Sequence, residues 1–495
     1  MTTAARETES TSLRTGAIGA AAQLFQSIAH IGPATGVIFA MPFMVSKGGG
    51  ALPLAAFFAM VCILLAGLCL REVVAKVSSA SGYFGIHSVA LGHFGGFTTS
   101  WLWFLDEPLV PAALSTIFGA VFSDFLDAHL SISIPWWVIT LVMIAALTTI
   151  SYVGVEQSAK LTITLASAEL VIMILLGLLL IIDAGGDQVA KALTPSASPH
   201  QWGGVFFATV FGITGLIGFE SGLPLSEETR DPKRSLSRAI VLSIVSIGAF
   251  FILLGYATVV GWGFPSPAKF ADSFSGATDP YFTLADHAFG AIGPWLIMFA
   301  LMNGSWGVAL AGQNAVTRVY YALGRNGIFP RALGKTHPVH KTPHRAILFQ
   351  GVLAAALALF LGLKFGPVTA FGLAALLMTL SLIVIYIVTN ISCFVLYWRD
   401  FRDEFSVARH AVLPLVATVV IAFPLVASIA PQVFFDFSNS YPLTLAGPII
   451  GIWFVLGLAY YAYLRARKPA QLHTLANELA AQHDDAAPEP VPVNA

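Results

Sequence analysis

The sequence predicts an all-α protein that crosses a membrane many times, and three observations lead to this prediction. Of the 495 residues, 57% are hydrophobic and only 10% are charged, whereas soluble proteins carry about 25% charged residues. Apolar runs long enough to cross a bilayer, roughly 20 residues each, recur along almost the whole chain. Lysine and arginine gather in alternate connections between these runs. We therefore expect a polytopic membrane protein.

The apolar runs define the expected spans. The basic connections alternate with connections that contain few cations, so the positive-inside rule places both termini in the cytoplasm. This agrees with an even number of spans. The twelve expected spans are residues 17–46, 51–71, 95–123, 135–153, 159–182, 203–226, 238–262, 286–312, 345–362, 367–397, 410–430 and 442–464.

The domain boundaries follow from the same pattern. Residues 1–16 are expected to form a polar cytoplasmic tail and residues 17–465 one transmembrane domain. Residues 466–495 are expected to form a second cytoplasmic tail, whose Pro-rich end is typical of disorder. Spans one to five and six to ten would then form two halves, with spans eleven and twelve as additional helices.

The first span contains a helix-breaking sequence, GPATG, halfway along its length. Pro33 has no N–H to donate to the carbonyl of Ala29, and its ring crowds that carbonyl. In a bilayer such a break persists only where it lines a cavity or is covered by protein. The first part of the candidate substrate site is therefore Ile28, Ala29, His30, Ile31, Gly32, Pro33, Ala34, Thr35 and Gly36.

A second weakened helix is expected in span six, where four glycines crowd the middle of an apolar run. Each costs about 1 kcal/mol relative to alanine in a helix interior. Matching interruptions in corresponding spans of two halves indicate a transporter binding site near the midplane, whereas a simple kink is the alternative for span one alone. The second part of the candidate site is Phe211, Gly212, Ile213, Thr214 and Gly215.

The two poles of a broken helix suit a zwitterion. The N–H groups of Ala34, Thr35 and Gly36 would form the positive pole and receive a carboxylate. The carbonyl groups that precede the break, together with those of span six, would receive an ammonium group. An amino acid or a small amine is therefore the expected substrate.

Three motifs occur in order and at characteristic spacing. EVVAKVSSASGYFGIHSVALGHFGGFTTSW runs from Glu72 to Trp101, GFESGLPLSEETRDPKRSLSRAI from Gly218 to Ile240, and RVYYALGRNGIFP from Arg318 to Pro330. With these motifs the chain resembles the amino acid–polyamine–organocation family of permeases over nearly all twelve spans.

The resemblance implies the leucine-transporter fold. That fold has two inverted repeats of five helices, spans one and six unwound at mid-membrane, two additional C-terminal helices, and transport by alternating access. The chain departs from the glycine-rich span-one motif of the family, because Pro33 replaces a flexible residue. This substitution alters the cradle expected for a substrate carboxylate.

Ionisable residues inside membrane helices are costly and are functional candidates by default. Asp106 lies in span three, and its spacing from Pro111 resembles that of putrescine importers in the family. A carboxylate there would receive a second ammonium group, or alternatively it is a buried acid that packs helices. Glu107 lies about 100° further round the helix, and we assign it no role.

Glu169 lies in span five, where the resemblance places the lysine that proton-coupled relatives have between spans one, five and eight. A carboxylate there either binds a proton or a cation or reaches the substrate amine, so Glu169 is the candidate coupling residue. His30 either carries a proton or bonds a neighbouring helix. Glu220 is expected to brace span six, and Glu227 and Glu228 either form a gate or belong to a solvated helix end.

The expected function is a secondary active transporter that imports amino acids or small amines across the cytoplasmic membrane, coupled to protons or to exchange. A polyamine or cationic-amine importer is the alternative; a channel and a transceptor are less favoured. We find no phosphate-binding, nucleophile or metal-ligating motif, so we expect no enzyme activity, cofactor or metal. The expected partners are the solute, the lipid bilayer and a proton, without nucleic acid, for a monomer or homodimer.

Overall fold

The structure is a computed structural model that describes residues 20–77, 83–154, 159–185, 189–220, 232–275, 280–325, 327, 329–433, 435 and 438–467. These residues contain no strand, so the all-α prediction is confirmed for them. The helices, with short 3₁₀ and π turns labelled η, are α1 Ala20–Ile31, α2 Pro33–Thr35, η1 Gly36–Ala40, α3 Met41–Gly48, α4 Leu52–Lys76, α5 Tyr83–Asp106, α6 Leu109–Leu130, α7 Trp136–Val153, α8 Ala159–Ala184, α9 Val189–Ala192, η2 Pro195–Ala197, α10 Gln201–Thr214, α11 Pro232–Trp262, α12 Pro267–Ser275, α13 Pro280–Phe289, η4 Gly290–Ile292, α14 Gly293–Arg325, α15 His344–Phe365, α16 Pro367–Arg399, η5 Arg402–Glu404, η6 Ala408–Val412, α17 Leu413–Ile429, η7 Pro431–Val433, η8 Leu443–Leu445 and α18 Ala446–Arg467.

Among the described residues, eleven helical stretches are long and apolar enough to cross a membrane. The expected span at 203–226 is not one of them, because α10 has only 14 residues and ends at Thr214. Residues 221–231 are outside the described part, so the count of twelve stays a prediction. The eleven stretches are Ser27–Gly48, Leu52–Lys76, Gly85–Leu130, Trp136–Val153, Leu161–Ala184, Ser237–Trp262, Pro280–Arg325, His344–Phe365, Pro367–Arg399, Ala408–Ile429 and Leu443–Arg467.

The third stretch differs from the expected span at 95–123. Helices α5 and α6 together extend over Gly85–Leu130, with an interruption at Glu107 and Pro108. Pro108 cannot donate to the carbonyl four residues earlier, and the Gln350 side chain of α15 donates to the Pro108 carbonyl at 3.1 Å. The third stretch is therefore interrupted beside the candidate residue Asp106. A second interruption, at Gly92 with φ 74° and ψ −176°, lies just before residue 95, where the expected span begins.

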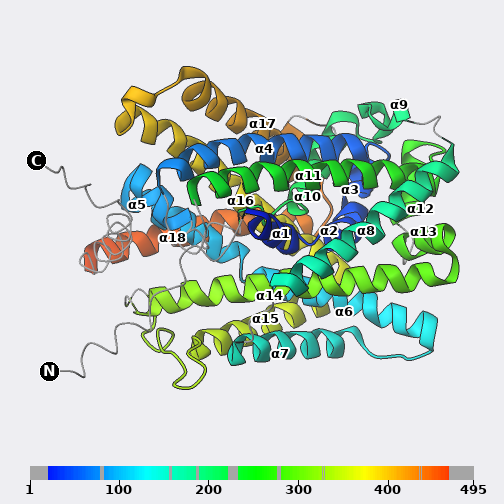
Figure 1. The fold of residues 1–495 in the computed structure, drawn as a ribbon, viewed down its shortest axis with the longest axis horizontal. Helices are drawn as coiled ribbons and strands as arrows, with labels where there is room; N and C mark the ends of the chain where they lie inside the picture. The colour runs from blue at the N-terminus through cyan, green and yellow to red at the C-terminus, as the bar shows by residue number, and fades with distance from the viewer. Residues whose placement is uncertain are drawn as a thin grey trace, which may run out of the picture.

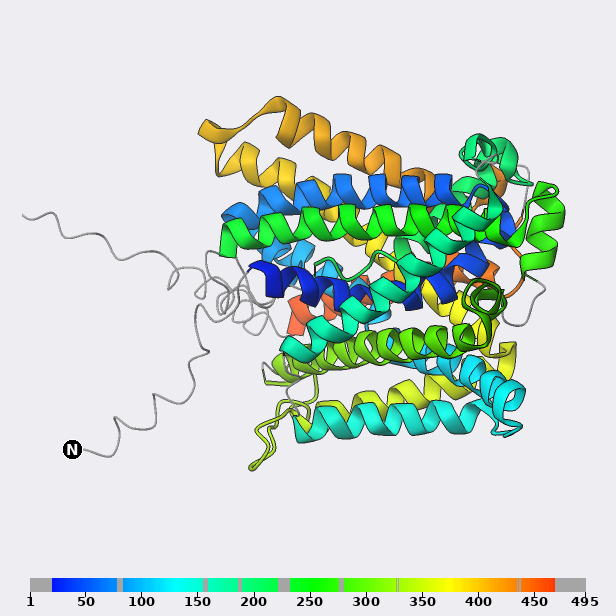
Figure 2. The same ribbon diagram turned by 45° about the vertical axis from the view of Figure 1, so that its right-hand side comes forward.

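The interrupted first span lies in the middle of the helix bundle. In Figure 1, α1 and α2 lie between α4 and α11 on one side and α14 on the other. Helix α8 crosses obliquely beside them in both views (Figures 1 and 2), and α6, α7 and α15 form a layer beyond α14. Helix α1 packs against α8, α11 and α14. The break is thus covered by protein, as a break at membrane depth requires.

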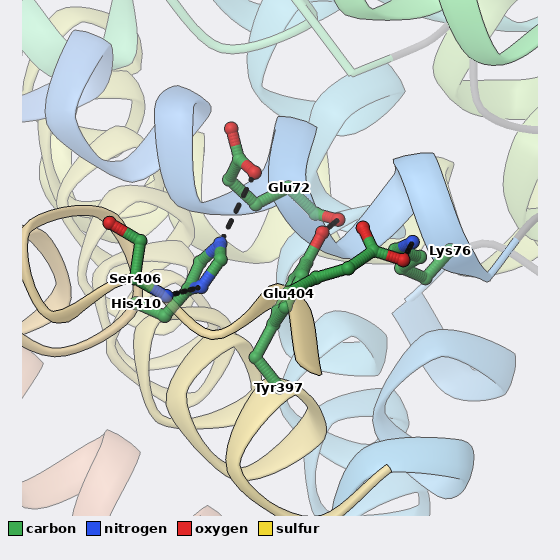
Figure 3. A network of polar contacts seen from close by, with 6 residues as sticks. All are labelled: Glu72, Lys76, Tyr397, Glu404, Ser406 and His410. Atoms are coloured by element: carbon green, nitrogen blue, oxygen red, sulfur yellow. Dashed lines mark hydrogen bonds and ion pairs between the residues drawn. The ribbon is translucent and has the colours of Figure 1, made fainter. Parts of the chain in front are cut away.

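A polar network joins α4, α16 and the segment that precedes α17 at one end of the bundle (Figure 3). The backbone N–H of Ser406 donates to His410 Nδ1 at 3.0 Å, so the proton of the neutral ring lies on Nε2. That nitrogen lies 3.4 Å from Glu72 Oε2, and the Tyr397 hydroxyl donates to the Glu72 carbonyl at 3.1 Å. Helices α4 and α16 are thereby fixed to each other and to the chain that enters α17.

Candidate functional site

The break in the first span is built around Gly32. Helix α1 ends at Ile31, and Gly32 has left-handed backbone angles, φ 60° and ψ 72°, before α2 begins with Pro33. A Cβ on Gly32 would lie 2.5 Å from the Val308 side chain of α14. Glycine is therefore required here both for its backbone conformation and for the close approach of α14.

The second interruption contacts the first. Helix α10 ends at Thr214, and a turn follows in which Gly218 has φ 112°. A Cβ on Gly218 would lie 2.8 Å from the His30 ring. The Ser27 hydroxyl of α1 donates to the Phe219 carbonyl at 3.3 Å. The end of α1 and the turn after α10 are thus packed directly on each other.

Two glycines, which have no side chain, allow this close approach. The Phe251 ring of α11 occupies the space where Cβ atoms of Gly36 and Gly215 would lie, 2.6 Å and 2.4 Å from the nearest ring atoms. A Cβ on Gly36 would also lie 3.3 Å from the Gly215 Cα atom. Residues of both predicted segments are therefore brought together around one aromatic ring.

Glu169 of α8 joins three spans. Its Oε1 accepts a hydrogen bond from the Ala34 N–H at 2.7 Å, and its Oε2 accepts one from Asn303 Nδ2 of α14 at 2.8 Å. The Glu169 side chain is buried, with 2% of its surface exposed. Acceptance at both oxygens is the bonding pattern of an ionised carboxylate. Glu169 thus lies between spans one, five and eight, the position that the family resemblance implied.

The N–H groups after the break differ from the expected arrangement. Ala34 donates to Glu169, and the Gly36 N–H donates to the Gly32 carbonyl at 2.9 Å. The Thr35 hydroxyl lies 3.4 Å from the Ser305 hydroxyl of α14. Two of the three N–H groups that we expected to receive a substrate carboxylate therefore have partners within the protein.

Further carboxyl groups gather at the interruption that follows α5. Asp106 and Glu107 are 2% and 7% exposed, and Asp106 lies within electrostatic range of both Glu107 and Glu220. Glu220 accepts hydrogen bonds from the Gly218 N–H and the Tyr386 hydroxyl, each at 3.2 Å. None of the described lysine and arginine side chains is buried. The described interior therefore has more acidic than basic groups.

The structure brings together most of the predicted residues. The segments 28–36 and 211–215, with Glu169 and Glu220, form one contiguous region, and Asp106 lies beside it. Glu227 and Glu228 lie outside the described residues. Sequence reasoning missed four contributors to this region: Phe251, Tyr386, Asn303 and Ser305. The last two belong to the sequence Asn-Gly-Ser within an apolar span, and these two polar residues were a signal that was available.

Comparison with known proteins identifies a family and several relatives of this chain. Residues 23–474 match the amino acid permease family. The chain is 26% identical to the branched-chain amino acid permease of Bacillus subtilis over 328 residues, 63% of this chain and 68% of the relative. It is 25% identical to the low-affinity putrescine importer of Escherichia coli over 364 residues, 72% and 75% of the two chains. It is 23% identical to the methylthioribose transporter of Bacillus subtilis over 405 residues, 77% and 82%. The names of these relatives specify three chemically different solutes.

Proposed function

Because the chain belongs to the amino acid permease family and is a multi-pass membrane transporter of small organic solutes rather than an enzyme, we propose that it is a secondary active transporter of amino acids or small amines. It imports its solute across the cytoplasmic membrane by alternating access. Its twelve spans form the leucine-transporter fold, with two inverted repeats, spans one and six unwound at mid-membrane, and both termini in the cytoplasm.

The contact between the two helix interruptions is the observation that carries this proposal. Gly218 of the turn after α10 packs on His30 at the end of α1. Pro33 leaves the Ala29 carbonyl without its helical donor, so the negative end of α1 is available to an ammonium group. Interrupted helices at corresponding positions of two halves are the arrangement from which transporter sites are built. The solute therefore binds between α1, α2 and the end of α10.

Glu169 is the coupling residue in this proposal. Its carboxylate holds the start of α2 to α8 and α14 through Ala34 and Asn303. Protonation would turn one of its two acceptor oxygens into a donor and would weaken these contacts. Uptake of a proton at Glu169 would thereby change how the three spans are held together, which couples proton movement to alternating access.

A cationic-amine importer is the second candidate, and Asp106 favours it. Asp106 is buried at the end of α5, directly before the interruption at Pro108, and lies within electrostatic range of Glu220. A buried carboxyl group in a membrane protein marks a solute or ion path by default. If the protein is a cationic-amine importer, Asp106 receives the second ammonium group of the solute.

Reconstitution tests the transport proposal directly. Proteoliposomes that contain the purified full-length protein should show saturable uptake of a labelled amino acid or amine. They should also show counterflow, in which unlabelled internal solute drives entry of the labelled form. Conductance without saturation or counterflow would instead identify a channel and overturn the proposal.

A further inference from the structure

We propose that the solute of this transporter is an organic cation without a carboxylate, because the chain fills the carboxylate position of its own site with Glu169. This inference rests on the transport function proposed above and narrows its solute class. The relevant position is the positive pole at the start of α2, where the N–H groups of an interrupted helix would otherwise face the solute.

At the positive pole of α2, two of the three N–H groups that follow Pro33 already have partners within the protein. Pro33 has no N–H, the Ala34 N–H donates to Glu169 Oε1 at 2.7 Å, and the Gly36 N–H donates to the Gly32 carbonyl at 2.9 Å. One carboxylate is enough to complement the partial charge of a helix N-terminus. A solute carboxylate at the same pole would lie beside the Glu169 carboxylate and be repelled by it.

Glu169 is also fixed in this position. Asn303 Nδ2 holds its second oxygen at 2.8 Å. A Cβ on Gly304 of α14 would lie 2.9 Å from Glu169 Oε1 and 2.5 Å from the Thr35 hydroxyl, so the α14 backbone packs closely on the carboxylate. The side chain is 2% exposed. The Glu169 carboxyl group is therefore fixed at the pole by its packing and hydrogen bonds.

The charge balance of the surrounding interior supports the same conclusion. Asp106 and Glu107 are buried, Asp106 lies within electrostatic range of Glu220, and none of the described lysine and arginine side chains is buried with them. A zwitterion brings no net charge to these groups, whereas an organic cation compensates them. Its ammonium group also has the Ala29 carbonyl at the end of α1 as an acceptor, since Pro33 cannot donate to it.

Matched pairs of solutes that differ only in the carboxylate test the inference. The pairs are leucine with isoamylamine, ornithine with putrescine, and lysine with cadaverine. We expect the amine of at least one pair to drive counterflow at least about tenfold better than its amino acid, the effect of one charged hydrogen-bond contact. Better counterflow with the amino acid in every pair would overturn the inference and leave the transport function intact. No counterflow with any of the six would overturn both.

Variants at Glu169 provide the second measurement. Glu169→Ala frees the Ala34 N–H, so the preference for amine over amino acid should fall at least about tenfold. Glu169→Gln keeps an acceptor for Ala34, removes the charge and preserves the packing, so its preference should fall by less. The control is Asp286→Ala, an exposed carboxylate on α13. If a folded Glu169→Ala protein has an unchanged preference for amine over amino acid, the inference is overturned. If that variant does not fold, an unchanged preference in the Glu169→Gln protein overturns it.

Discussion

The Glu169 carboxylate of α8 lies 2.7 Å from the backbone nitrogen of Ala34, whose N–H donates to it in the interrupted first span. Its other oxygen is held by Asn303 of α14. One buried side chain thus connects the segment directly after the break to two other spans. A junction of this kind is sensitive to protonation, because a protonated carboxyl group cannot accept hydrogen bonds in the same way at both oxygens.

Glu169→Gln should separate transport from proton coupling. The amide has nearly the same shape and cannot take up a proton, so counterflow should persist while accumulation no longer follows an imposed pH gradient. Uptake into proteoliposomes with and without an inward proton gradient measures this. Asp286→Asn, at an exposed position on α13, is the control and should accumulate solute as the unmodified protein does. If accumulation by Glu169→Gln still follows the pH gradient, another group couples transport to protons.

Gly218→Ala should disrupt the contact between the two interruptions. Its φ of 112° is costly for a residue with a Cβ, and the left-handed region costs about 1–2 kcal/mol. The new Cβ would also lie 2.8 Å from the His30 ring, an overpacking that costs typically 1–3 kcal/mol. We expect a lower unfolding temperature and loss of most transport.

Gly185→Ala is the matched control for that variant. Gly185 also has a positive φ, 71°, but a Cβ there would meet nothing within 4 Å. The Gly185→Ala protein should therefore lose only the stability that the backbone conformation costs, and it should keep its transport activity. Equal transport by the Gly218→Ala and Gly185→Ala proteins would show that contact between the interruptions is not needed for function.

The sequence predicts the positions of the helix interruptions better than it predicts which distant residues contact them. The break at Gly32 and Pro33 and the end of α10 at Thr214 lie in the predicted segments, because glycine and proline act on the local backbone. The bond from Ala34 to Glu169 joins residues 135 positions apart. It depends on how α8 is rotated against α2, which no local pattern specifies. The interruption at Pro108 was visible as a proline, but a proline within an apolar run is compatible with either a kink or a break.

Trp101 of α5 and Trp453 of α18 should stabilise the protein as a coupled pair. Each indole Nε1 donates to the backbone carbonyl of the other residue at 2.7 Å, and the rings stack with centroids 4.8 Å apart. Each Trp→Phe change removes one bond worth about 0.5–1.5 kcal/mol, so each single variant should unfold at a lower temperature. Unfolding in detergent, followed for both single variants and the double variant, measures the coupling.

A double-mutant cycle compares the stability lost in the double variant with the sum of the losses in the two single variants. Aromatic pairs contribute about 0.5–1.5 kcal/mol beyond their buried area, so the double variant should lose less stability than the sum of the single ones. Trp137→Phe, on the exposed side of α7, should change little. Strict additivity at Trp101 and Trp453 would show that the two rings act independently.

His410→Phe should destabilise the end of the bundle shown in Figure 3. Phenylalanine preserves the ring that stacks on Tyr397, at 3.6 Å between centroids, but it removes the acceptor for the Ser406 N–H and the partner of Glu72. Leaving buried polar groups unpaired costs about 1–3 kcal/mol. Thermal unfolding of the variant should show this loss, whereas His340→Phe, at an exposed position, should not. Equal stability of the two variants would mean that solvent replaces the lost contacts.

Asp106→Asn tests whether the third span contributes to amine recognition, and its neighbour provides the control. Both residues are buried at the same interruption and lie within electrostatic range of Glu220. They differ in that Glu107 Oε1 approaches α14, where it would lie 3.5 Å from a Cβ on Gly312. Removing the Asp106 charge should raise the KM for a diamine at least about tenfold, as loss of one charged hydrogen bond does. The KM for a monoamine should rise less, because it has no second ammonium group. Glu107→Gln should leave the ratio of the two KM values unchanged, since its carboxyl group faces α14. If Asp106→Asn leaves uptake of diamines and cationic amino acids unchanged, Asp106 is a packing residue and the second ammonium group binds elsewhere.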